Sequence, residues 1–101
     1  MDALTKSLRA VANEQRVRIL RMLSKEGEMS VSQISRRINL SFKSTSRHLL
    51  RLEDVGLVKR RQDSLWVYYS INRGGLNRYN RALLQLIKGK ISLSIESKTE
   101  G

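Results

Sequence analysis

The sequence predicts a mainly α-helical domain that carries one small β-hairpin. Apolar residues recur at helical spacing in several segments before residue 56, and the period then changes from helical to alternating. A last helical pattern begins near residue 76. With 101 residues, the chain is long enough for one domain with a modest core but not for two. We expect this domain to span residues 1–91 and residues 92–101 to form a flexible tail.

Composition excludes several classes of protein. The chain has no cysteine, so disulfides, thiolate metal sites and cysteine nucleophiles are excluded. No apolar run approaches the ~20 residues of a membrane helix, and the N-terminus lacks the apolar core of a signal peptide. We therefore expect a cytoplasmic location and no membrane partner. Twenty lysines and arginines against nine acidic residues give a net charge of +11, which indicates a polyanionic partner.

Two helices are expected before residue 28. The first runs from about Asp2 to Ala12, and its apolar face is Leu4, Leu8, Val11 and Ala12. Asn13 is a suitable cap for the second helix, which Gly27 ends. The inner stripe of the second helix is expected to be Val17, Leu20 and Leu23. The positions of this helix that are expected to face solvent are Arg16, Arg18 and Arg21.

A closely spaced pair of helices is expected between residues 30 and 56. Ser30 with Gln33 three residues on is a capping-box start, and Asn39 tolerates the left-handed conformation that ends a helix. Ser41 is a good cap for the next helix, which Gly56 closes. The apolar faces are Val31, Ile34 and Ile38 in the first helix and Thr45, Leu49 and Leu52 in the second. Two helices joined by so short a turn form a helix-turn-helix, whose second helix can lie in the major groove of DNA.

The outer face of that second helix carries candidate DNA contacts, because steps of three and four residues share a helical face. Its members are Lys43, Ser46, Arg47 and Leu50. Arg47 is the best single candidate for a base contact, since its fork can pair with guanine. Ser41 and Ser44 can donate to a phosphate at the helix N-terminus, although Ser41 is equally well explained as a plain cap. Phe42 is expected either to touch a thymine methyl or sugar or to pack under the helix. The alternative for the whole set is a solvated helix face.

A β-hairpin is expected directly after this helix pair. Residues 57–61 and 65–71 are rich in β-branched and aromatic residues, and the polar residues 62–64 suit the turn. Such a hairpin is a wing, and Arg60 and Arg61 near its tip are candidates for contact with phosphates or an adjacent minor groove. The aromatic residues of its second strand are predicted to be mostly core: Trp66, Tyr68 and Tyr69. Brief pairing of the hairpin with residues 28–31 is also expected.

The last helix is expected from Leu76 to about Lys88. It and the first helix present more apolar surface than the core of one small domain needs. Leftover apolar stripes indicate a partner, most simply a second copy related by a two-fold axis, although the stripe of the last helix also suits the wall of a ligand pocket. The predicted dimer contacts are Leu4, Leu8, Leu76, Tyr79, Leu83, Leu86 and Ile87.

Several motifs stand in a recognisable order along the chain. They are Asn13-Glu14-Gln15-Arg16-Val17-Arg18-Ile19-Leu20, Leu40-Ser41, Ser46-Arg47-His48-Leu49, Gly56-Leu57-Val58 and Trp66-Val67-Tyr68-Tyr69. Over roughly residues 4–87 this order resembles the ArsR-like winged-helix repressors. The resemblance implies a homodimer that binds an imperfect inverted repeat in a promoter and blocks transcription. It also implies release by a ligand, often a metal ion.

The chain departs from that family at its metal sites. Metal sensors of the family commonly carry Cys-Val-Cys where this chain has Ser30-Val31-Ser32, and serine hydroxyls are poor ligands for soft metals. Another family site uses His and carboxylates on the last helix, but residues 76–90 contain no His, Asp or Glu. His48, the only histidine, is interpreted as structural. We therefore expect no metal and no cofactor, so the protein either responds to another signal or binds constitutively.

The sequence thus indicates a dimeric, sequence-specific DNA-binding regulator, most simply a repressor at an inverted-repeat operator. The candidate contacts to double-stranded DNA are Ser41, Phe42, Lys43, Ser44, Ser46, Arg47, Arg60 and Arg61. Two alternatives stay open: a winged helix that binds an acidic protein partner, and a non-specific architectural DNA-binding protein. Catalysis is rejected, because one histidine and scattered carboxylates supply no paired acid and base.

Overall fold

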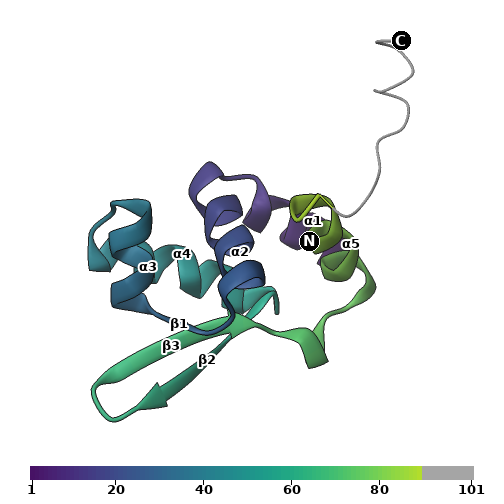
Figure 1. The fold of residues 1–101 in the computed structure, drawn as a ribbon. Coiled ribbons are helices and arrows are strands. Elements are labelled where there is room, and N and C mark those ends of the chain that lie inside the picture. The colour runs from purple at the N-terminus through teal and green to yellow at the C-terminus, as the bar shows by residue number, and fades with distance from the viewer. Residues whose placement is uncertain (90–101) are drawn as a thin grey trace.

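The computed structural model describes residues 1–89 as helices packed around one small sheet (Figure 1). The helices are α1 (Ala3–Val11), α2 (Glu14–Glu26), α3 (Val31–Ile38), α4 (Phe42–Asp54) and α5 (Arg78–Ile87). The strands are β1 (Met29–Ser30), β2 (Val58–Asp63) and β3 (Trp66–Ile71), and a 3₁₀ turn spans Arg73–Gly75. The predicted class, mainly α with a small hairpin, is confirmed. The tail predicted at residues 92–101 lies outside the described residues, as do residues 90 and 91 of the predicted domain.

Side-chain caps set the close spacing of α3 and α4. Ser30 Oγ accepts from the N–H of Gln33 at 3.1 Å while Gln33 Oε1 accepts from the N–H of Ser30 at 2.8 Å, which completes the predicted capping box. Asn39 has φ 59°, the left-handed conformation predicted to end α3. Ser41 Oγ then accepts from the N–H of Ser44 at 3.0 Å and starts α4. The helix-turn-helix predicted from residues 30–56 therefore forms.

The end of α4 is a hydrogen-bonded turn that requires glycine. Gly56 has φ +84°, where a residue with a side chain would be strained. The N–H of Gly56 donates to the carbonyl of Glu53 at 2.9 Å, and the N–H of Leu57 donates to the carbonyl of Leu52 at 3.1 Å. These two bonds are those of a Schellman motif. The turn leads from α4 almost directly into β2, so it fixes where the hairpin leaves the helix.

The three strands form an antiparallel sheet in the order β1-β3-β2. Met29 pairs with Tyr69 and Ser30 with Tyr68, so the predicted pairing of residues 28–31 with the hairpin is confirmed. β2 and β3 are longer than β1, and their far ends extend past the helices as a wing (Figure 1).

The turn of the hairpin lies later than predicted. β2 continues to Asp63, which pairs with Trp66, so residues 64–65 form the turn in place of residues 62–64. Ser64 has φ 58°, and a positive φ at the first turn residue suits the two-residue turns whose twist matches a hairpin. Leu65, predicted to begin the second strand, is therefore at the wing tip and is 92% exposed.

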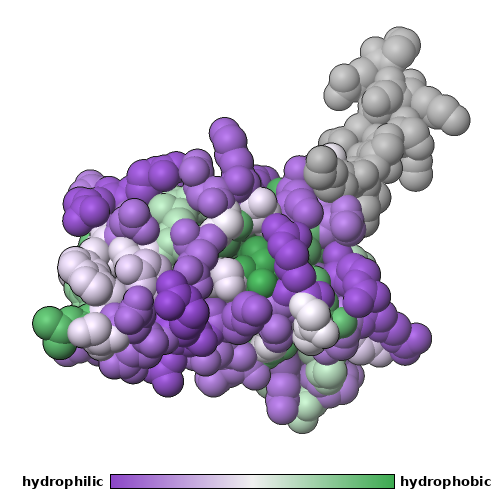
Figure 2. Space-filling model, turned by 60° about the horizontal axis from the view of Figure 1, so that its bottom comes forward, coloured by the Kyte–Doolittle hydropathy of each residue, from purple (hydrophilic) through white to green (hydrophobic). Residues whose placement is uncertain are grey.

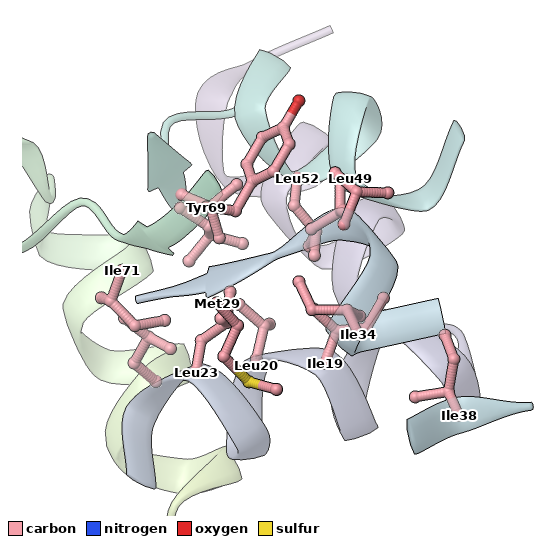
Figure 3. Packing of buried hydrophobic residues seen from close by; sticks show 14 residues of the cluster. Ile19, Leu20, Leu23, Met29, Ile34, Ile38, Leu49, Leu52, Tyr69 and Ile71 are labelled. Carbon is pink, nitrogen blue, oxygen red and sulfur yellow. The ribbon is translucent and has the colours of Figure 1, made fainter. Parts of the chain in front are cut away.

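The hydrophobic core lies between α2, α3, α4 and the base of the sheet (Figure 3). Tyr69 and Ile71 contribute to it from β3, and the hydroxyl end of Tyr69 points out of the cluster. Burying aliphatic side chains of this size stabilises the fold by about 1.5–3 kcal/mol each. The stripes predicted for α3 and α4 are confirmed as core. The fully buried apolar members of the core from α2 to the start of β2 are Ile19, Leu20, Leu23, Ile34, Leu49, Leu52, Leu57 and Val58.

α1 and α5 pack against each other at the end of the domain far from the wing tip (Figure 1). α5 begins at Arg78 with Asn77 as its cap, two residues later than predicted. Leu84 is the residue of α5 buried in the core, whereas Leu86 is exposed. Leu84 lies beside the predicted apolar stripe, and of the stripe itself Leu76 and Ile87 pack partly against the core while Leu86 is on the surface.

A buried polar cluster joins α1, α4 and α5. Asn80 of α5 is only 1% exposed, and its Oδ1 accepts from the hydroxyl of Ser7 in α1 at 2.6 Å. Its Nδ2 donates to the carbonyl of Val55, the residue that caps α4, at 2.8 Å. One side chain therefore satisfies a buried hydroxyl and a carbonyl at the end of α4. Both would lack a protein partner without it, and buried polar groups of this kind are costly.

Replacing Asn80 by Ala is expected to lower the free energy of unfolding by about 2 kcal/mol or more, because it leaves Ser7 and the Val55 carbonyl unpaired. For a domain of this size the melting temperature should fall by about 8 °C or more. Thermal unfolding followed by circular dichroism measures both quantities. Arg81→Ala, on the exposed side of the same helix, is the control. Equal melting temperatures for the two variants would contradict this role of Asn80.

Candidate nucleic-acid interface

The exposed face of α4 carries the cationic side chains predicted to contact DNA. Lys43, Arg47 and Leu50 are exposed, as the spacing predicts, whereas Ser46 is half-buried. The opposite face of α4 is held by Thr45, Leu49 and Leu52, each fully buried. Arg47 makes no ion pair within residues 1–89. Its guanidinium group is thus available to a partner outside the domain.

The first turn of α4 combines a cap with an exposed aromatic side chain. The hydroxyl of Ser41 is engaged as the helix cap, while Ser44 is half-buried one turn on. Phe42 is 56% exposed, so the alternative that it packs under the helix is wrong. The open backbone N–H groups of a helix N-terminus attract anions. The start of α4 therefore offers anion-binding groups beside an apolar ring.

The two predicted arginines of the wing differ in their surroundings. Arg61 donates from Nε to Glu28 Oε2 at 2.9 Å and from Nη2 to Glu28 Oε1 at 2.8 Å, a bidentate pair. Its guanidinium also lies over the ring of Tyr68, 4.6 Å from the ring centre. Arg60 is exposed and makes no ion pair in the part of the chain described. Of the two, Arg60 is the cation left available.

The pKa values of the pair are shifted in the directions that a strong hydrogen-bonded contact produces. The hydrogen bonds from Arg61 hold the pKa of Glu28 below its ordinary value, and Glu28 raises the pKa of Arg61 in return. Both groups therefore stay charged near neutral pH. Since both are exposed, the pair orients Arg61 more than it stabilises the fold.

The aromatic residues of β3 do not all belong to the core. Tyr69 is buried, but Trp66 is 54% exposed and Tyr68 is half-buried, so the prediction that all three are mostly core is wrong for Trp66. Alternation along the strand explains the difference, because Tyr69 and Ile71 face the core whereas Trp66 and Tyr68 face the other side. Trp66 and Tyr68 share one face of the strand and line an open hollow with Ser32 and Arg36 of α3.

The residues at the start of α3 do not fit a soft metal ion. The hydroxyl of Ser30 is engaged as the cap of α3. Oxygen donors of this kind are poor ligands for the metals that thiolates bind. Within residues 1–89 no cluster of three or more His, Cys, Asp or Glu side chains is placed to hold a metal ion.

The contact between Arg16 and His48, beside α4, was not predicted from the sequence. Arg16 was expected to face solvent, but it is buried, with 9% of its surface exposed. Its Nη1 lies 3.1 Å from Nδ1 of His48, on α4. The helical spacing from Arg16 to Leu20 and Leu23 was a usable signal, since steps of four and three place all three residues on the inner stripe. Val17, assigned to that stripe, is only half-buried.

The predicted dimer residues lie on α1, on α5 and just before α5, and two of them, Leu76 and Ile87, pack partly against the core. Leu4 and Leu8 of α1 and Leu86 of α5 are exposed. The others are half-buried, and Tyr79 is covered by Arg78, whose guanidinium lies 5.0 Å from its ring centre. Because α1 and α5 are neighbours, the exposed leucines belong to one end of the molecule. Elsewhere the surface turned to the viewer in Figure 2 is mostly hydrophilic, with small apolar areas. No helix within residues 1–89 is long and apolar enough to span a membrane.

A short turn between α3 and α4, a cationic outer face on α4 and a wing after it define a winged helix-turn-helix DNA-binding domain. Residues 13–60 match the family described as "Bacterial regulatory protein, arsR family". The chain is 36% identical over 70 residues to the HTH-type transcriptional regulator YgaV of Escherichia coli K12, an alignment that covers 69% of this chain and 71% of YgaV. The chain therefore belongs to the ArsR family.

Other relatives agree with this assignment. The transcriptional activator HlyU of Vibrio cholerae is 42% identical over 65 residues, which cover 64% of this chain and 59% of HlyU. The structure of reduced HlyU from Vibrio cholerae matches with a TM-score of 0.70 at 34% identity and covers 84% of each chain. The homodimeric winged helix-turn-helix domain of Mb0332 from Mycobacterium bovis matches with a TM-score of 0.72 at 28% identity, covering 86% of this chain and 76% of that one.

The match to curated relatives is partial in length. The chain spans between 50% and 59% of the length of several of them, HlyU included. The relatives named above are regulators and not enzymes, which agrees with the rejection of catalysis.

Neutralising Arg60 is expected to weaken binding to duplex DNA more than neutralising Arg61, because Glu28 already holds Arg61. Arg60→Ala should reduce the slope of log affinity against log salt by about one, and Arg61→Ala by clearly less. In a Glu28→Ala background, where Arg61 keeps only the weaker contacts with Asp63 and Tyr68, Arg61→Ala should cost clearly more than it does in the wild type. Fluorescence anisotropy over a salt series measures these slopes. Equal effects of the two substitutions in both backgrounds would show that the ion pair does not restrain Arg61.

Proposed function

We propose that the chain is a dimeric, sequence-specific DNA-binding transcriptional regulator. The observation that carries the proposal is the outer face of α4, where Lys43 and Arg47 are exposed without an ion pair while the opposite face is fixed in the core. In a winged helix-turn-helix such a helix enters the major groove, and an arginine there pairs with guanine. The net charge of +11 supports binding to a polyanion.

The proposed contacts divide by role. Arg47 reads a base edge, with Phe42 against a thymine methyl or sugar, and the wing adds a phosphate or minor-groove contact from Arg60. Arg61 is expected to make a second contact of this kind once its ion pair with Glu28 opens. The remaining contacts, to phosphates or the groove wall at the start of α4, are Ser41, Lys43, Ser44 and Ser46.

A symmetric dimer gives the regulator its operator geometry. The exposed leucines of α1 and α5 need a partner surface, and a second copy supplies a complementary one through a two-fold axis. Two recognition helices about 34 Å apart match one turn of duplex DNA. We therefore expect the operator to be an inverted repeat with half-sites one turn apart.

We propose that the protein represses transcription and does not activate it. A dimer that occupies a promoter blocks other proteins by occupancy alone, whereas activation needs a further surface that contacts the transcription machinery. HlyU, one of the relatives, is named an activator, so the test must include the sign. Transcription from the operator-bearing promoter in a purified system, with and without the protein, measures it.

The signal that controls binding is expected to differ from that of thiolate metal sensors. The chain has no cysteine, and Ser30 uses its hydroxyl as a helix cap. We propose that no metal or cofactor is needed for DNA binding and that the protein acts in the cytoplasm, where promoter DNA is found.

Replacing Arg47 by Ala is expected to weaken operator binding by about 1–3 kcal/mol and to relax the preference at one base pair in each half-site. The wild type should prefer one inverted repeat over scrambled duplexes by about a thousandfold or more at ~0.15 M salt. Anisotropy with duplexes from the region upstream of the protein's own coding sequence measures both.

Lys25→Ala is the matched control for Arg47→Ala, because it removes one exposed charge at the far end of α2. Equal binding of the wild type to every duplex would favour the architectural alternative. Absence of binding to any duplex would favour an acidic protein partner, for which the exposed Phe42 and Leu50 provide apolar contacts.

Replacing Leu8 and Leu86 together by Glu is expected to give monomers at micromolar concentration, since the charges would lie in the proposed dimer interface. Both side chains are exposed in the single chain, so the fold should be retained. Sedimentation velocity measures the mass. Leu65→Glu places the same charge on an even more exposed leucine at the wing tip and should leave the dimer intact. A dimer of unchanged stability in the double variant would refute this interface.

A further inference from the structure

Arg16 is a buried cation that uses its donors on two different elements. Its Nε donates to the carbonyl of Ala10 and its Nη2 to the carbonyl of Arg9 at 3.5 Å, both in the last turn of α1. Within residues 1–89 it makes no ion pair with a carboxylate. A guanidinium has only donors, so its remaining N–H groups need acceptors. The acceptor on the α4 side is His48.

The contact fixes the protonation state of His48. Nη1 of Arg16 lies 3.1 Å from Nδ1 of His48, and an arginine can only donate there. Nδ1 must therefore carry its lone pair, so the ring is neutral with its proton on Nε2. A protonated ring would place an N–H against the N–H of Arg16, with two positive charges in contact. The hydrogen bond exists only while His48 is neutral.

The contact lies directly beside the reading face of α4. His48 follows Arg47 in the sequence, and Leu49, the next residue, is fully buried. Arg16 thus connects the end of α1 to α4 at the level of the proposed base contact. The Asn80 bond to Val55 holds the far end of the same helix. The two contacts are polar anchors at different points along a helix whose opposite face is held in the core by Thr45, Leu49 and Leu52.

We propose that Arg16 and His48 are positioning residues for DNA binding: the neutral His48 ring accepts from Arg16 and holds α4 in its reading orientation, and protonation of His48 releases it. The inference rests on the proposed function, because its readout is affinity for DNA. It assigns to the only histidine a role other than metal binding.

The charges around His48 act in the same direction. Burial is the main cause that lowers the pKa of His48, followed by Arg16 from α2 and then Arg51 from α4 itself. Arg51 lines a hollow with Lys6 and Arg9 of α1 and with Asp54, so α1 adds further positive charge on that side. Protonation is thus disfavoured at neutral pH and becomes significant only below the ordinary histidine pKa of 6.5.

The direction of the pH dependence distinguishes this positioning role from that of a histidine that merely lies near the DNA phosphates. A half-buried histidine that merely lies near phosphates would be protonated more easily in the complex, so acid would strengthen binding. A histidine that positions α4 only when neutral predicts the opposite. Stability has the same sign: the unfolded chain binds the proton more readily, so protonation destabilises the fold as the pH drops below 6.5.

The experiment compares wild type with His48→Asn, whose Oδ1 occupies nearly the place of Nδ1 and accepts a hydrogen bond at every pH. Operator affinity at pH 5.5 relative to pH 7.5 is measured by anisotropy for both proteins. Wild type should lose about twofold or more relative to His48→Asn, which is the loss that a pKa about half a unit lower in the bound than in the free protein gives close to the titration midpoint. His48→Leu, which lacks an acceptor, should bind weakly at both pH values.

Nuclear magnetic resonance of the free protein tests the contact without DNA. His48 is the only histidine, so its ring signals need no assignment. A proton on Nε2 and a pKa below 6.5 are expected, together with a melting temperature that falls with acid more steeply in wild type than in His48→Asn. A proton on Nδ1, or identical pH dependence of DNA affinity in the two proteins, would overturn the inference alone. Wild type that binds no duplex would overturn the proposed function and the inference with it.

Discussion

The hydrogen bond from Asn80 to the carbonyl of Val55 joins α5, which carries part of the proposed dimer surface, to the end of α4, the proposed DNA-reading helix. α5 and α1 carry the exposed leucines, and α4 carries Arg47. A buried amide that loses its partner is costly, so α5 cannot easily shift without moving the end of α4 or breaking this bond. The wing follows through the Gly56 turn, which leads from α4 almost directly to β2. In the proposed dimer, packing between the two copies would therefore bear on the spacing of the two α4 helices through a short chain of contacts.

The features that could be predicted from the sequence are the local ones. Ser30, Asn39, Ser41 and Gly56 act within three or four residues of themselves, so residue type and spacing are enough to place the helix ends. The core stripes of α3 and α4 follow from periodicity in the same way. The turn of the hairpin was placed too early because polar composition marks a turn only roughly, whereas register is set by pairing with the neighbouring strand.

Contacts between polar residues far apart in the sequence could not be predicted. Asn80 bonds to Ser7, 73 residues away, and Glu28 bonds to Arg61, 33 residues away. The local sequence around these residues does not indicate their partners, because a polar residue on a predicted helix or strand is expected to face solvent. The consequence for the candidate site is direct. Arg60 and Arg61 are equal in sequence, yet only Arg60 is without an internal anion in the described part of the chain.

Arg16 shows why a single chemical fact can change the interpretation of a site. Its spacing from Leu20 and Leu23 favours burial, and its charge favours exposure; the structure resolves the conflict with backbone carbonyls and one imidazole in place of a carboxylate. An acidic partner would have made the contact insensitive to protons near neutrality. An imidazole makes it conditional, since histidine is the side chain whose ordinary pKa lies between 5 and 8. In a chain with no cysteine and one histidine, the side chain best suited to change charge in that range lies on the proposed reading helix and contacts Arg16.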